Sequence, residues 1–183
     1  HLPSRSQRSD ESVQHREYRT YLSLQMRPMI HALMLVATLA YLVAVLASTL
    51  LNPSMLSPWL RAIPLLPLVL VAFSTRRALT PGALSALTLV FIALLEIGIN
   101  LNTLGNPHRA SMVLPGLLLP VVSSVIWLGS WDFIAGMIVC ALGPLPMLLI
   151  GNTDSVQIVQ YLVYMAVAIA VAFCTLAGAS ALV

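Results

Sequence analysis

From Pro28 onward, apolar runs about as long as a bilayer is thick follow one another with only short polar breaks. A helix needs about 20 residues to cross a hydrocarbon core of roughly 30 Å. The chain has 59% hydrophobic and 8% charged residues, whereas a soluble domain has about 25% charged residues. The sequence therefore predicts an all-α polytopic membrane protein and leaves no room for a second globular domain within its 183 residues.

The apolar runs predict six transmembrane helices. Short segments rich in Pro, Gly, Asn or Arg separate the expected spans, which are 29–51, 59–75, 82–104, 110–128, 131–150 and 156–183. Pro64 and Pro67 should kink the second span or leave carbonyl groups for its neighbours to satisfy. The segment Gly143-Pro144-Leu145-Pro146 should break the fifth span.

Residues 1–27 form a polar, arginine-rich lead-in to a transmembrane domain that spans 28–183. Within the lead-in, residues 10–27 can form an amphipathic helix lying along the inner membrane surface. The apolar residues on or near one face of that helix are Val13, Tyr18, Tyr21, Leu22 and Met26.

Arginine placement predicts the orientation. Five of the nine basic residues precede the first span, and Arg76 and Arg77 follow the second, which leaves Arg61 and Arg109 on the other side. The positive-inside rule then places both termini on the cytoplasmic side of the membrane. The basic residues are thus an interfacial feature beside the lipid bilayer, and no nucleic-acid partner is expected.

The last apolar run is longer than the bilayer core requires. Residues 156–183 would form a helix of roughly 42 Å at 1.5 Å per residue. We expect its end to project into the cytoplasm, and we expect the native protein to continue into a cytoplasmic domain.

Glu96 is the one carboxylate well inside an expected span. An ionisable group there is costly to bury and is a candidate functional residue. Asn100 follows one turn later, and Arg61, Tyr161 and Tyr164 lie at the outer ends of the second and sixth spans. Together they predict an outward-facing polar pocket for a small hydrophobic or amphipathic ligand.

The alternative for Glu96 is one structural ion pair that holds the second and third spans together. Arg61 is a plausible partner for that pair, as are His108 and Arg109 in the next outer connection. Both interpretations stay open from the sequence alone.

Small residues recur at three- and four-residue spacing in the first and last spans, which lets helices approach closely. Packing within the bundle and packing across a homodimer both use this spacing, and we favour a homodimer seam that includes the last span. The residues concerned are Ala37, Ala40, Ala44, Ala47, Ala166 and Ala170.

Catalytic and cofactor motifs are absent from the sequence: it has no zinc-protease, serine-hydrolase or phosphate-loop pattern and no Cys-x-x-Cys. His31 is the only histidine within a span, which disfavours haem, and Cys140 and Cys174 are interpreted as packing residues. We therefore expect no catalytic residue, metal or cofactor in this part of the protein.

The architecture from Asp10 to Val183 resembles the membrane-associated sensor (MASE-type) regions of bacterial signalling proteins. It shares with them a basic amphipathic lead-in, six closely connected spans and a last helix that overruns the membrane. The resemblance implies a homodimer whose last helix regulates a cytoplasmic diguanylate cyclase or, next, an adenylyl cyclase or histidine kinase. A diguanylate cyclase output would use GTP and Mg²⁺, so the full-length protein would be an enzyme.

Two rival functions involve transport. The six-span substrate-binding subunits of energy-coupling-factor vitamin transporters have a similar length and topology, and their Ala-x-x-x-Ala pattern is matched by Ala40 and Ala44. A proton-coupled carrier using Glu96 is the third possibility, although no inverted repeat is visible in the sequence.

Overall fold

The computed structural model describes residues 5–51, 57–78, 80–104, 119–126, 130–145 and 155–181, and this part of the chain contains helices and no strand. Four helical stretches are long and apolar enough to cross a membrane: Thr20–Leu51, Pro58–Arg77, Pro81–Thr103 and Ile158–Thr175. A fifth apolar helix, Trp131–Leu142, is shorter. The expected all-helical membrane protein is confirmed, whereas the expected fourth span is described only over residues 119–126.

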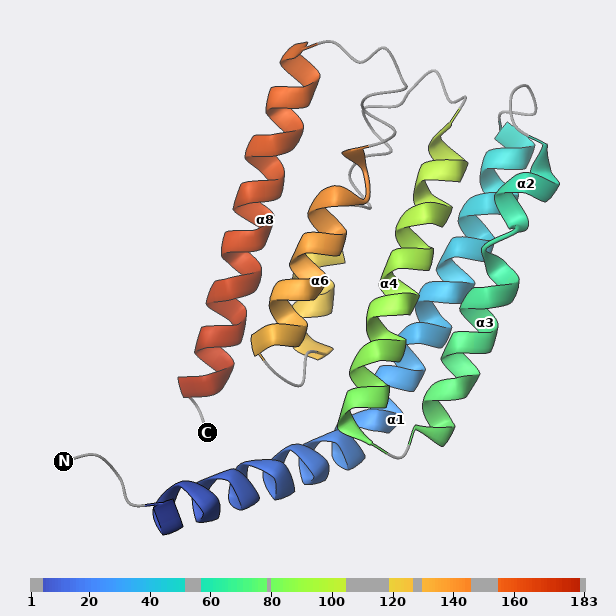
Figure 1. Ribbon diagram of the computed structural model, residues 1–183. Helices are drawn as coiled ribbons and strands as arrows, with labels where there is room; N and C mark the ends of the chain where they lie inside the picture. Colours follow the sequence, from blue (N-terminus) through green and yellow to red (C-terminus); the bar gives the residue numbers. More distant parts are fainter. Residues whose placement is uncertain are drawn as a thin grey trace.

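The helices form a bundle in which α4 is central. It contacts α1 and α3 on one side and α6 on the other, and α8 lies beyond α6 (Figure 1). The described elements are α1 (Arg5–Leu51), α2 (Pro58–Ala62), α3 (Leu65–Ser74), η1 (Thr75–Arg77), α4 (Pro81–Thr103), η2 (Ser124–Ile126), α6 (Ser130–Leu142) and α8 (Ser155–Ala181).

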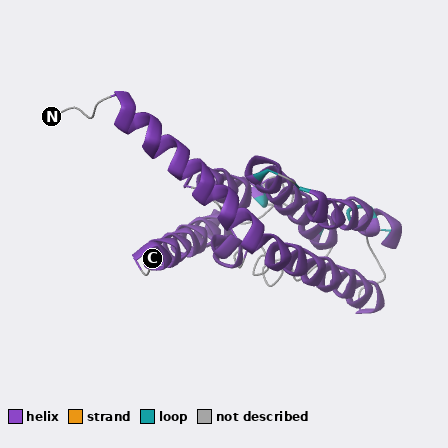
Figure 2. Cartoon of the chain, turned by 90° about the horizontal axis from the view of Figure 1, so that it is seen from below, coloured by secondary structure: helices purple, strands orange, loops and turns teal. Residues whose placement is uncertain are grey.

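α1 is a single helix, although the sequence predicted a lead-in helix and a separate span. Its first part lies across one end of the bundle before the rest turns into it (Figures 1 and 2). Pro28 lies inside this helix, and a proline lacks the N–H that would bond the preceding turn. The change of direction is therefore accommodated without an interruption of the helix.

The apolar side chains near this bend are divided between the bundle and its surroundings. Leu22 and Met26 pack against the core formed by α1, α3 and α4. Tyr18 and Tyr21 are exposed. Tyrosines of this kind are typical of the interface between lipid and water.

The expected break in the second span is confirmed. α2 ends at Ala62, α3 begins at Leu65, and Pro64 lies in the turn between them. The Tyr41 hydroxyl of α1 donates to the Arg61 carbonyl at 2.6 Å. A neighbouring side chain thus satisfies a carbonyl at the broken end, as lipid surroundings require.

His31 joins α1 to α3 and η1 at the end of the bundle where α1 bends. Its Nε2 accepts a hydrogen bond from Nε of Arg76 at 2.8 Å. The hydrogen of the neutral ring therefore lies on Nδ1, which donates to the Ala72 carbonyl at 2.7 Å. His31 is a buried structural residue in this fold.

Gly98 leaves room for the Tyr41 ring, because a Cβ at this position would lie 2.8 Å from Cζ of Tyr41. We expect Gly98→Ala to displace the Tyr41 ring and to lower the free energy of unfolding by about 1–3 kcal/mol. Chemical or thermal unfolding in detergent micelles measures the loss. Gly82→Ala is the matched control on the same helix, since nothing lies within 4 Å of its added Cβ, and an equal loss in both variants would refute this role of Gly98.

Candidate functional site

α4 carries polar groups on two opposite sides. Glu96 and Asn100 are one helical turn apart and lie toward α6, where the Asn100 amide donates to the Gly143 carbonyl at 2.7 Å. The Gly98 carbonyl and Asn102 lie toward α1, where they contact Tyr41 and Ser48. The structure therefore separates the polar residues of α4 into two clusters with the helix between them.

The first group, the arginine cluster, consists of Arg61, Ser48, Asn102 and Tyr41. The Arg61 side chain is only 4% exposed, and its Nη1 donates to Oγ of Ser48 at 2.9 Å. Oγ of Ser48 lies 2.7 Å from Oδ1 of Asn102. Nε and Nη2 of Arg61 have no hydrogen-bond partner in the described part of the chain. A single hydroxyl thus anchors a buried guanidinium to α1 and α4.

The second group, the glutamate cluster, consists of Glu96, Asn100, Cys140, Gly143 and Tyr161. Glu96 is 2% exposed, and among the described residues neither of its carboxyl oxygens has a hydrogen-bond partner. A Cβ on Gly143 would lie 2.9 Å from Cγ, Cδ and Oε2 of Glu96. The carboxyl group therefore lies directly against the backbone at the end of α6.

α6 and α8 complete the glutamate cluster. Tyr161 of α8 donates its hydroxyl hydrogen to the Ala141 carbonyl at 3.2 Å, and Cys140 of α6 is fully buried. Both side chains lie close enough to interact electrostatically with Glu96. Three helices thus converge on this carboxyl group.

The end of α6 shapes this cluster. α6 stops at Leu142 and a turn follows over residues 143–144, as the Gly-Pro-Leu-Pro segment predicted. The last carbonyls of a helix have no donor within it. Tyr161 and Asn100 supply donors to two of them, at Ala141 and Gly143.

The predicted pocket residues are only partly brought together. Glu96, Asn100 and Tyr161 form one cluster, whereas Arg61 lies in the other. Tyr164 is 57% exposed on another side of α8. The alternative ion pair between Glu96 and Arg61 is not formed, because neither carboxyl oxygen has a partner among the described residues. His108 and Arg109 lie outside the described residues.

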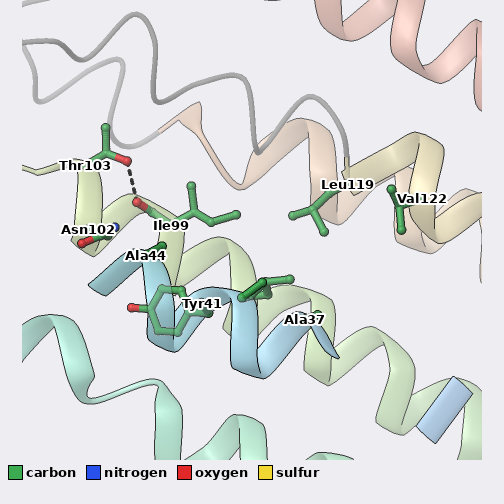
Figure 3. Close-up of a pocket in the computed structure, with 10 residues that line it drawn as sticks. Ala37, Tyr41, Ala44, Ile99, Asn102, Thr103, Leu119 and Val122 are labelled. Atoms are coloured by element: carbon green, nitrogen blue, oxygen red, sulfur yellow. Dashed lines mark hydrogen bonds between the residues drawn. The ribbon is translucent and has the colours of Figure 1, made fainter. Parts of the chain in front are cut away.

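A cavity of about 390 Å³ lies between α1, α4 and the helical residues 119–123. Figure 3 shows Asn102 and Thr103 toward one end of it, with Leu119 and Val122 facing α1 and α4. Its lining is mostly apolar and comprises Ala37, Ala40, Tyr41, Ala44, Leu95, Ile99, Asn102, Thr103, Leu119 and Val122. None of the five predicted pocket residues lines it. Its volume suits a small apolar or amphipathic molecule.

The small residues of the first and last spans have different surroundings. Ala37, Ala40 and Ala44 line the cavity, and Ala47 is exposed. On α8, Ala166 and Ala170 are exposed, while Ala168 and Ala172 pack inward.

Several residues of the two clusters were not predicted from the sequence. Tyr41 and Ser48 lie seven residues apart, a spacing that places them on one face of α1, but nothing identified that face as polar and buried. Cys140 was interpreted as a packing residue, and Gly143 only as part of a helix break. Their contacts depend on how α6 is rotated against α4. In the described part of the chain, no three His, Cys, Asp or Glu residues form a group able to hold a metal ion.

The Ser48 hydroxyl accepts a hydrogen bond from Nη1 of the buried Arg61. Ser48→Ala leaves that charged group without this acceptor, and we expect a loss of about 1.5–3 kcal/mol in unfolding free energy. Denaturant titration in detergent measures it. Ser74→Ala is the control, since the Ser74 hydroxyl is exposed and bonds only within its own helix, and a similar loss there would contradict the anchoring role of Ser48.

A scan against models of protein families and searches of curated proteins and of solved structures found no match to this chain.

Proposed function

We propose that this chain is a membrane-embedded sensor and dimerisation module whose last helix regulates a cytoplasmic signalling domain. The observation that carries the proposal is that α8 has two distinct sides. Tyr161, Met165 and Ala172 are buried against the bundle, and Tyr161 is near enough to Glu96 to interact with it electrostatically. The opposite side carries Ala166, Ala170 and Cys174, all exposed. One rigid helix thus connects a buried polar site to a surface suited to a second copy.

The peripheral position of α8 suits this role. Within its apolar stretch Ile158–Thr175, only 22% is buried, against 44% for an apolar stretch of the same length in α4. A helix with few contacts to its own bundle can be displaced at lower cost than a central one. Spaced alanines on its outer side allow close approach of a partner helix in lipid.

The proposed topology has six crossings of a bacterial inner membrane. Both termini lie in the cytoplasm, and residues 10–27 lie along the inner membrane surface. The N-terminal part of α1 and the C-terminal end of α8 lie at the same end of the bundle (Figure 1). Arg76 and Arg77 lie at that end as well, since Arg76 bonds His31 near the bend of α1. This gathering of arginines supports the proposed orientation.

The proposed input is a small hydrophobic or amphipathic ligand in the cavity between α1 and α4. Leu119 and Val122 line this cavity, and η2, which follows them directly, contacts α8. A ligand that favours one packing of residues 119–126 would thereby bias the position of α8. The effect on the output can be no larger than the difference in ligand affinity between the two packings.

The favoured output is a diguanylate cyclase, with an adenylyl cyclase or histidine kinase next. A diguanylate cyclase joins two GTP molecules with the aid of Mg²⁺, so two catalytic domains must meet. In a membrane dimer, the paired α8 helices would set the distance between the two catalytic domains. The proposed enzyme activity belongs to the full-length protein.

The alternative is a substrate-binding subunit of a small-molecule transporter, and one observation favours it. α6 ends at Leu142, and Gly143, the next residue, lies directly beside the buried Glu96. Helices interrupted inside the membrane are common at transporter binding sites, where their free carbonyls meet the substrate or coupling ion.

The dimer proposal predicts oxidative cross-linking through Cys174, which is exposed, while Cys140 is buried. We expect copper phenanthroline to convert most of the full-length protein in native membranes to a disulfide-linked dimer. Cys174→Ser should abolish the dimer band on a non-reducing gel, and Cys140→Ser should leave it unchanged. A wild-type protein that stays monomeric under these conditions would argue against an α8 seam.

The output proposal predicts that the native protein purified from its own membranes is longer than this chain by about 150 residues or more, the size of one domain. We expect it to form cyclic di-GMP from GTP only when Mg²⁺ is present, as measured by chromatography of the products. A native product ending near Val183 would contradict the sensor proposal, and uptake assays with candidate partner subunits would then test the transporter.

A further inference from the structure

Glu96 is a buried acidic group without a counter-charge among the described residues. It is 2% exposed, it lies within a membrane-spanning helix, and its two oxygens have no partner among the described residues. An ionised carboxylate buried within a membrane-spanning helix is strongly disfavoured unless a positive group compensates its charge. Some positive charge must neutralise it.

The described side chains near Glu96 cannot provide that charge. From the neighbouring elements these are Asn100, Cys140, Tyr161 and Ser123, which interacts with Cys140, and none of them is cationic. Asn100 donates to the Gly143 carbonyl and Tyr161 to the Ala141 carbonyl. Among the described residues, both side chains therefore direct their hydrogen bonds at the backbone at the end of α6.

The end of α6 makes the surroundings of Glu96 more negative. The carboxyl end of a helix carries partial negative charge, and Gly143 at this end lies directly against Glu96. Arg61 cannot compensate from its present position, because it is held by Ser48 in the arginine cluster toward α1. The site is therefore rich in oxygen acceptors and poor in positive charge.

We propose that Glu96, together with the carbonyl end of α6, binds a monovalent cation, either a proton or an alkali-metal ion. A proton needs no added space beside Gly143. An alkali ion would need the contact between Glu96 and Gly143 to open before carbonyl oxygens could coordinate it. The site does not depend on the nature of the output and would serve a sensor or a transporter alike.

The test is infrared spectroscopy of the full chain in liposomes, with ¹³C-carboxyl glutamate so that only Glu11, Glu17 and Glu96 contribute. Spectra are recorded from mildly acidic to mildly alkaline pH, with choline chloride or sodium chloride at equal ionic strength. Glu96→Gln identifies the band of Glu96 by difference, and circular dichroism with thermal unfolding checks that this variant keeps its fold.

A proton site predicts the carbonyl stretch of a neutral carboxylic acid at neutral pH, lost in Glu96→Gln and unaffected by sodium. An alkali-ion site predicts that sodium, at constant pH, replaces this band with that of an ionised carboxylate. An ionised Glu96 in choline at neutral pH would overturn the proposal, because the protein itself would then supply the counter-charge.

A second variant keeps the test valid if Glu96→Gln does not fold. Gly143→Ala places a Cβ 2.9 Å from Oε2 of Glu96 and should shift the frequency of the Glu96 band. Gly82→Ala, whose Cβ meets nothing within 4 Å, should leave the band in place. Identical spectra for these two variants and the wild type would show that the band does not arise from the site at the end of α6.

Discussion

The fold depends on finding hydrogen-bond donors for the backbone carbonyl groups at two helix ends inside the apolar bundle. The carbonyl groups at the ends of α2 and α6 lack helical donors, and a bilayer core offers no water in their place. The Tyr41 hydroxyl reaches the Arg61 carbonyl, and the Tyr161 hydroxyl reaches the Ala141 carbonyl. These donors come from α1 and α8, so each hydrogen bond ties an interrupted helix to an uninterrupted one.

α4 is the element around which both interrupted helices are arranged. Gly98 gives the Tyr41 ring room to approach on one side, and the Asn100 amide bonds the end of α6 on the other. Because its two polar sides face different neighbours, the buried ionisable groups of Arg61 and Glu96 remain apart. This separation explains why the Arg61 guanidinium is anchored by a hydroxyl, while the Glu96 carboxyl lacks any hydrogen-bond partner among the described residues.

The proposed function and the proposed cation site meet at α8. Tyr161 connects this helix to the glutamate cluster, and η2 connects it to the segment that lines the cavity. A change in either place alters the contacts that hold α8 to the bundle. Ala166 and Ala170 lie on the outer side of α8, so such a change would alter the proposed contact with a second copy.

The sequence by itself determined the helical membrane class, the proline-induced interruption of the second span and of the fifth, and the presence of an acid in the third. Each follows from local chemistry, namely apolar length, the missing N–H of proline and the cost of burying charge. Only the tertiary structure decided that Glu96 lies against Gly143 and not beside Arg61, and that Ala37, Ala40 and Ala44 line a cavity. The physical reason is that lipid is as apolar as most side chains, so the pattern along one helix does not specify its rotation or its neighbour. Those are set by the packing of all the helices together.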